Sequence, residues 1–151
     1  YSKIRILWFH LSISCKGVTM SIKNITSSDI TLAKAYFTIL VETAIKKSTI
    51  SYGDLVSLSK ERYSDDKEIA GGIATTAGRR LAVLRDHTDL FDLADLSCLV
   101  VNAGTEEAGD AYHLKEEVQS LRASVYETNW LDFYTSIHKA LDMTRAEYGK
   151  R

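Results

Sequence analysis

Long apolar runs and cysteine pairs are both missing from this sequence. The apolar residues are dispersed among charged ones, and no stretch approaches the roughly 18 to 20 apolar residues that a membrane-spanning helix needs. The two cysteines, Cys15 and Cys98, lie far apart and form no CxxC pair. This usage fits a reducing compartment better than a disulfide framework, so we expect a cytoplasmic protein without a membrane span.

Proline, internal repeats and low-complexity tracts are also absent. No segment therefore has the composition of a linker that would divide the chain. The chain has 151 residues, of which 45% are hydrophobic and 26% charged. This size suits one globular domain with a sizeable core. We expect a single domain over residues 20–151 and a non-core extension over residues 1–19.

Residues 1–19 differ from the rest because they are rich in aromatic and aliphatic side chains and contain no acidic residue. A weak secretion signal, an edge strand and an extension outside the core all remain open. The apolar run is short and no cleavage site is evident, which argues against a signal. Three of the 19 basic residues and none of the 20 acidic ones lie here. Residues 20–151 therefore carry a net charge of −4, against −1 for the whole chain.

Recognisable cofactor and catalytic motifs are missing too. The sequence has no GxGxxG, GxxxxGK[ST] or GxSxG pattern. Its four histidines lie apart from one another and from any cysteine at metal-ligand spacing, which predicts surface or capping histidines. His87 follows Asp86 at a predicted helix end, where the helix dipole would favour an imidazolium. We expect neither a cofactor nor a metal.

The spacing of apolar residues predicts a first amphipathic helix over residues 30–47. Ser28 or Asp29 can cap its start, and Lys46 and Lys47 complement the negative pole at its end.

A β-branched segment over residues 49–54 leads into a second predicted helix that ends near Tyr63. A polar loop over residues 64–68 follows. The third predicted helix spans residues 73–87, with one apolar face formed by Ile73, Ala77, Leu81 and Leu84.

Residues 86–95 form an acidic connection, and the apolar, β-branched residues 96–101 predict a buried strand. After a turn at residues 102–104 and a second acidic loop at Glu106, Glu107 and Asp110, the chain is predicted to be helical from His113. A break near Thr128 and Asn129 divides this tail, and the apolar stripe of its last helix is Trp130, Phe133, Tyr134, Ile137 and Leu141.

Three motifs lie in one order along the middle of the chain. The first is Ile50 to Leu55, with tyrosine, glycine and an acid at its centre. The second is Ala77 to Leu81. The third is Leu96 to Asn102, followed by Gly109 to Tyr112. In this order and spacing, residues 49–112 resemble the C-terminal winged-helix domain of the alkylguanine-DNA alkyltransferases and the alkyltransferase-like proteins.

The resemblance implies a mostly helical α/β fold with a winged-helix-like core over about residues 28–112. A short sheet and flanking N- and C-terminal helices would complete it. Cys98 falls at the reactive cysteine of that family. Ser97, Leu99 and Val100 replace the proline, histidine and arginine around it, and an apolar environment raises a thiol pKa. Thr75 stands at the family's base-displacing arginine. We therefore expect an inert Cys98 and no alkyl transfer.

The helix over residues 73–87 is the one element whose side chains suggest a particular function. Its basic and hydroxyl side chains are predicted to face solvent, where they could reach phosphates or base edges of DNA. We expect non-catalytic nucleic-acid binding through Tyr52, Thr75, Thr76, Arg79, Arg80 and Arg85. An equally simple interpretation is a solvated helix flank.

The charge of −4 over residues 20–151 counts against DNA and motivates an alternative. An acidic domain with negative loops could inhibit a basic nuclease or another toxin protein, as immunity proteins and antitoxins do.

Overall fold

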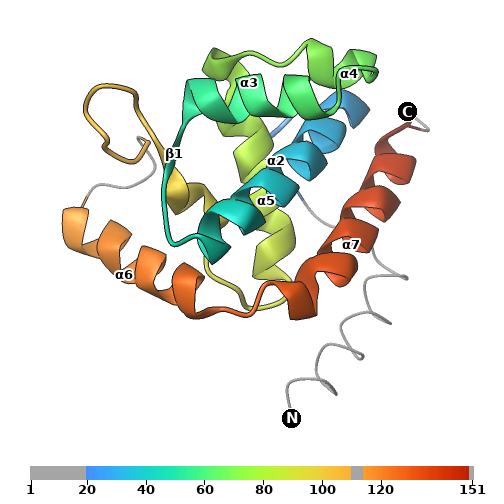
Figure 1. The fold of residues 1–151 in the computed structure, drawn as a ribbon. Coiled ribbons are helices and arrows are strands. Elements are labelled where there is room, and N and C mark those ends of the chain that lie inside the picture. Colours follow the sequence, from blue (N-terminus) through green and yellow to red (C-terminus); the bar gives the residue numbers. More distant parts are fainter. Residues whose placement is uncertain (1–19, 110–113, 150–151) are drawn as a thin grey trace.

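The computed structural model describes residues 20–109 and 114–149, and Figure 1 shows their arrangement. The expectations for residues 1–19, Asp110 and His113 lie outside the described residues. In chain order the elements are α2 (Ser27–Ile45), β1 (Ile50–Ser51), α3 (Tyr52–Arg62), α4 (Lys67–Ala70), η1 (Ala74–Thr76), α5 (Ala77–Asp89), η2 (Leu96–Leu99), β2 (Val100–Val101), α6 (Lys115–Glu127) and α7 (Leu131–Gly149).

Helix α2 is the central element, with α5 behind it and α7 beside it (Figure 1). It is buried on almost every side, so the prediction of an amphipathic helix is wrong. Between Asp29 and Ala44, only Lys34, Thr38 and Glu42, four residues apart, are half-buried, and they form one stripe. A helix surrounded by other helices needs apolar side chains around most of its circumference.

The start of α2 also differs from the prediction. Thr26 is the N-cap and accepts a hydrogen bond from the backbone of Asp29, whose carboxylate accepts one from the backbone of Thr26. This capping box moves the helix start upstream of the predicted residue 30. At the other end, Lys47 lies beyond the helix with a φ of 53°.

The segment over residues 49–54 behaves as predicted. It forms β1 and then α3, where the Ser51 hydroxyl caps the helix by accepting a hydrogen bond from Asp54 at 3.0 Å. Helix α3 ends at Arg62, next to the predicted Tyr63. Residues 64–68 are not one loop, because Asp66 caps the short helix α4.

The predicted strand over residues 96–101 is only partly confirmed. The Asp95 carboxylate accepts a hydrogen bond from the backbone of Ser97 and starts the 3-10 turn η2, which leaves only β2 extended. Strand β2 pairs in parallel with β1, with Ile50 opposite Val100. The predicted burial of the whole segment is confirmed.

The third predicted helix begins as η1 and continues as α5 to Asp89, so the acidic connection is shorter than expected. Ala77, Leu81 and Leu84 are buried as predicted. Ile73 is 52% exposed, which corrects its assignment to the apolar face.

The helical tail divides as predicted into α6 and α7. Trp130 lies between them with 1% exposure, and its indole N–H donates to the Val125 carbonyl at 2.8 Å. Ile137 and Leu141 are buried, while Phe133 and Tyr134 are half-buried against the core. The structure is thus mostly helical with a small two-stranded parallel sheet. Within the described ranges, no helix has the length and apolar character needed to cross a bilayer.

Candidate functional site

The candidate site is a pocket of about 520 Å³ at the N-terminal ends of α3 and α5. Three of the six predicted nucleic-acid-binding residues line it, namely Tyr52, Thr75 and Arg85. The other described residues in its wall are Ile22, Ala74, Gly78, Leu81, Ala82, Ser97, Asn102 and Gly109. The lining therefore combines aliphatic side chains with a phenol, hydroxyls, an amide and one guanidinium.

Each of the three sequence motifs contributes to this pocket. Tyr52 is the first residue of α3 and follows the N-cap Ser51. Gly78 and Leu81 come from the first turns of α5, and Ser97 comes from η2. The parallel pairing of β1 with β2 brings the first and third motifs together. Segments that are about 45 residues apart in sequence thus form one wall.

Arg85 supplies the positive charge of the pocket. Its side chain is 35% exposed, and its guanidinium lies 4.0 Å from the Asp95 carboxylate. That carboxylate also accepts the hydrogen bond from Ser97 that begins η2. The Asp95 side chain is 11% exposed, but the pair is long and the guanidinium is partly in solvent, so Arg85 can still turn toward a bound anion.

Arg79 and Arg80 point away from the pocket and bind Asp29 of α2. Arg79 donates to the Asp29 carboxylate at 3.3 Å and to the Asn24 carbonyl at 2.9 Å. The Arg80 Nε lies 2.7 Å from the same carboxylate, and Arg80 also hydrogen-bonds the Thr76 hydroxyl. The side chain of Arg80 is only 14% exposed. The expected solvent-facing basic surface is therefore wrong for Arg80, whereas Arg79 pairs with Asp29 and keeps 34% of its side chain exposed.

The carboxylate of Asp29 explains why both arginines turn toward α2. Its side chain is 3% exposed. Burial alone would raise the pKa of Asp29, but the hydrogen bonds from Thr26 and Arg79 and the charge of Arg80 outweigh it and lower that pKa. A buried carboxylate needs such partners to remain ionised. Asp29 thus orients the arginines as a structural group.

Cys98 is fully buried and is not among the described lining residues. Burial, reinforced by the negative charge of Asp95 and only partly offset by Arg122, raises the pKa of the Cys98 thiol to about 12. The thiolate is the nucleophilic form of cysteine, and at neutral pH almost none is present here. This environment agrees with the expectation of an inert cysteine.

The prediction of His87 as a surface or capping residue, charged at a helix end, is wrong. His87 has 0% exposure and lies within α5, where its ring bonds to the Val83 carbonyl at 2.7 Å and to the Thr144 hydroxyl at 2.8 Å. Burial lowers the pKa of His87, although the Val83 carbonyl and Asp86 oppose this. Among the described residues, no group of three or more His, Cys, Asp or Glu side chains could hold a metal ion.

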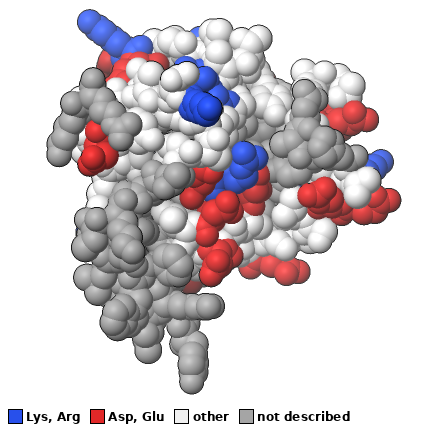
Figure 2. Space-filling model, turned by 180° about the vertical axis from the view of Figure 1, so that it is seen from behind, with Lys and Arg blue, Asp and Glu red and all other residues white. Residues whose placement is uncertain are grey.

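Acidic side chains surround the far end of α5. Burial raises the pKa of Asp89, and the charges of Asp95, Asp86 and Asp92 raise it further, against a smaller effect of Arg85. Figure 2 shows the side of the molecule that lies behind α2 in Figure 1, and no continuous blue area appears on it. The pocket thus offers one guanidinium within an acidic surface.

Ser97, Asn102 and Gly109 were not predicted as site residues. All three belong to the third motif, whereas Tyr52 belongs to the first, so the shared order of the motifs was the available signal. Their convergence depends on the pairing of β1 with β2. Strands of two residues are too short to be predicted from a sequence pattern. Comparison with protein-family models, curated proteins and solved structures finds no match for this chain.

Proposed function

We propose that this chain is a non-catalytic nucleic-acid-binding module that contacts its ligand through the pocket formed by Tyr52, Thr75 and Arg85. The observation that supports it is the convergence of all three sequence motifs on one pocket. An unrelated chain that matched the motifs by chance would not be expected to bring them together. The proposal drops Arg79, Arg80 and Thr76 as ligands, because those three residues are not in the described lining of the pocket.

The proposal includes a winged-helix-like core. In this interpretation α5 is the recognition helix, and its N-terminal turn carries the pocket. The hairpin over residues 102–109, closed by an antiparallel bridge between Val101 and Ala108, takes the place of the wing. A recognition helix that presents its N-terminal residues to the ligand is the usual arrangement in such domains.

Binding without chemistry is proposed because the cysteine that the resemblance places at the reactive position is not activated. Cys98 lies outside the described lining, and its high pKa keeps the thiol protonated. The thiolate is the nucleophilic form of cysteine.

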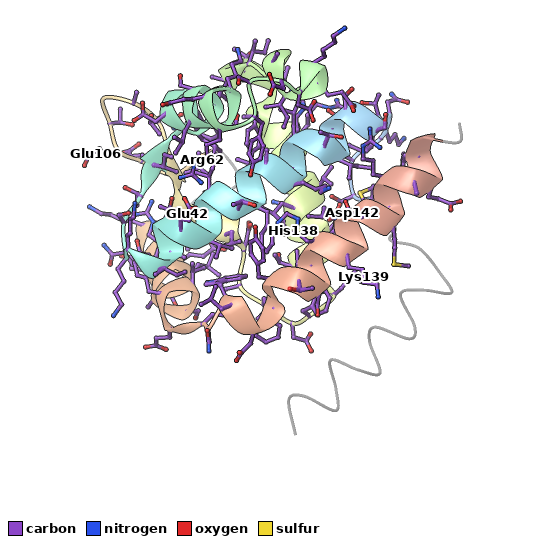
Figure 3. All side chains as sticks on the ribbon, turned by 45° about the vertical axis from the view of Figure 1, so that its right-hand side comes forward. Glu42, Arg62, Glu106, His138, Lys139 and Asp142 are labelled. Atoms are coloured by element: carbon purple, nitrogen blue, oxygen red, sulfur yellow. The ribbon has the colours of Figure 1, made fainter. Side chains whose placement is uncertain are left out.

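Fluorescence anisotropy with labelled duplex and single-stranded oligonucleotides over a range of salt concentrations tests the proposal. Arg85→Ala is expected to weaken binding about tenfold and to lower the salt slope by about one, as the loss of one phosphate contact would. Lys139→Ala is the matched control. It removes one positive charge from an exposed position on α7, at the opposite side of the molecule from Glu106 (Figure 3).

Two results would refute this function. The first is wild-type affinity weaker than millimolar at low salt for every oligonucleotide. The second is an equal loss of affinity in Arg85→Ala and Lys139→Ala, because a uniform effect of net charge needs no pocket.

A second candidate is inhibition of a basic nuclease or another basic toxin protein, and one observation favours it. The pKa of Asp89 is raised in part by three neighbouring aspartates, so a cationic partner would relieve a repulsion already present in the fold. Charge complementarity of this kind speeds association and sets specificity. Co-purification should then yield a cationic protein whose activity the chain suppresses, and Asp89→Asn with Asp92→Asn should reduce that suppression.

A further inference from the structure

Gly109 and Tyr52 meet at the wall of the pocket. Tyr52 comes from the start of α3, and Gly109 ends the hairpin over residues 102–109. A Cβ atom added to Gly109 would overlap the hydroxyl oxygen of Tyr52 and would lie 3.4 Å from its Cζ. The space beside Gly109 is therefore already filled by the tyrosine hydroxyl.

The hairpin that carries Gly109 is held closed by its own backbone. The Asn102 N–H donates to the Glu107 carbonyl at 2.8 Å, and the Glu106 N–H donates to the Asn102 carbonyl at 3.0 Å. The Val101–Ala108 bridge adjoins these bonds. Asn102 and Gly109 both line the pocket, so the two ends of one closed hairpin form a single wall.

From this geometry we infer that Gly109 is a positioning residue for the pocket. Because Gly109 has no side chain, the Tyr52 hydroxyl can occupy the space beside it. The contact between Gly109 and Tyr52 then joins the hairpin to α3. The inference rests on the proposed function for its effect on affinity. The effect of Gly109 on the position of Tyr52 can be measured without a ligand.

Gly109→Ala tests the inference. The methyl group must displace the Tyr52 hydroxyl or push the hairpin outward, because two atoms cannot share that space. Nucleic-acid affinity is expected to fall about tenfold, comparable with the loss of one contact to an aromatic side chain. Gly53→Ala is the matched control, since it adds the same methyl group next to Tyr52 with nothing within 4 Å.

A second variant makes the test specific to the hydroxyl. Tyr52→Phe removes the overlapping oxygen, and the remaining distance of 3.4 Å from Cβ to the ring is ordinary van der Waals contact. Gly109→Ala should therefore cost less than about twofold in affinity in the Tyr52→Phe background, although it costs about tenfold in the wild type. An equal cost in both backgrounds would overturn the inference.

Crystal structures of wild type and Gly109→Ala supply a readout that needs no ligand. A displaced Tyr52 ring or a shifted hairpin, with an unchanged Gly53→Ala structure, supports the inference. An unmoved ring and hairpin contradict it. If the wild type binds no oligonucleotide, the proposed function fails, and these structures alone decide the role of Gly109.

Discussion

Arg80 and Arg85 lie on the same helix, one and a half turns apart, and have opposite environments. The Arg80 side chain is 14% exposed and pairs with a carboxylate that is 3% exposed. The Arg85 side chain is 35% exposed, and its carboxylate partner is 4.0 Å away. One arginine is therefore part of the structure, whereas the other is available to a ligand at the pocket.

The difference shows that residue type and helix position do not set the role of an arginine. Asp29, 50 residues upstream, approaches α5 from α2 and draws in both Arg79 and Arg80. Helices α2 and α5 pack closely against each other, so a buried acid on one must be neutralised by the other. Positive charge on α5 is thus split between internal pairing and the pocket.

The largest expected effect comes from removing the charge of Asp29. Asp29→Asn keeps an oxygen for the capping box but leaves the arginines without a counter-charge, so the free energy of unfolding should fall by roughly 3 kcal/mol. Asp95→Asn, the matched change beside Arg85, should cost less than that, because the Arg85 guanidinium lies 4.0 Å away and is 35% exposed. Urea unfolding of both variants measures the contrast, and equal losses would contradict it.

The same pair has a pH signature. The pKa of Asp29 in the folded state lies below its ordinary value of 3.8. Its stabilising contribution is therefore complete above that value and is lost as the pH falls through the lower folded pKa. Acid unfolding of Asp29→Asn should lack this contribution.

The next effect separates stability from affinity. Arg80→Met should lower the free energy of unfolding by about 2 kcal/mol, because a buried charged group loses a partner. Arg85→Met should change it by less than about 0.5 kcal/mol, as at most surface positions. We expect only Arg85→Met to reduce nucleic-acid affinity under conditions where both proteins are folded. Thermal melts and binding curves of both variants check this. If both variants lower stability, or both lower affinity, the contrast between Arg80 and Arg85 is wrong.

A third ionisable side chain of α5 sharpens the comparison, because His87 is buried without a counter-charge in direct contact. Its pKa is lowered from 6.5, so the unfolded chain binds the proton more strongly, and stability is lost as the pH falls below that value. The slope from one proton is at most about 1.4 kcal/mol per pH unit.

His87→Gln should flatten this slope in urea unfolding between neutral pH and about pH 5. Burial also lowers the pKa of His138, so His138→Gln is the control for a second histidine that is only half-buried. If the slope persists in His87→Gln and disappears in His138→Gln, His138 causes the pH dependence and the prediction for His87 is wrong.

The smallest effect is expected at the hairpin tip, where Glu106 and Glu107 are exposed. Replacing both with glutamine should raise nucleic-acid affinity by about threefold at low salt and should lower affinity for a basic protein partner. Anisotropy and a competition assay with the same variant measure the two directions. Reduced affinity for a basic protein, without any gain in nucleic-acid affinity, would favour the inhibitor function over nucleic-acid binding.

Local signals were sufficient where one short segment determines its own structure. The start of α3 and the break between α6 and α7 follow from neighbouring residues, and the structure confirms them. The 3-10 turn η2 was missed because the Asp95 side chain outweighs the β-propensity of the apolar residues that follow. The candidate site was half predicted, since Tyr52, Thr75 and Arg85 line the pocket while Arg79 and Arg80 do not.

The sequence by itself determined the main helices and the apolar neighbours of Cys98, namely Leu99 and Val100. Only the tertiary structure decided which charged side chains remain available. An ionised group is stabilised by whichever opposite charge reaches it, and Asp29 reaches Arg79 and Arg80 across the packing of α2 on α5. Such long-range pairing leaves no trace in local spacing, because the partners lie 50 residues apart.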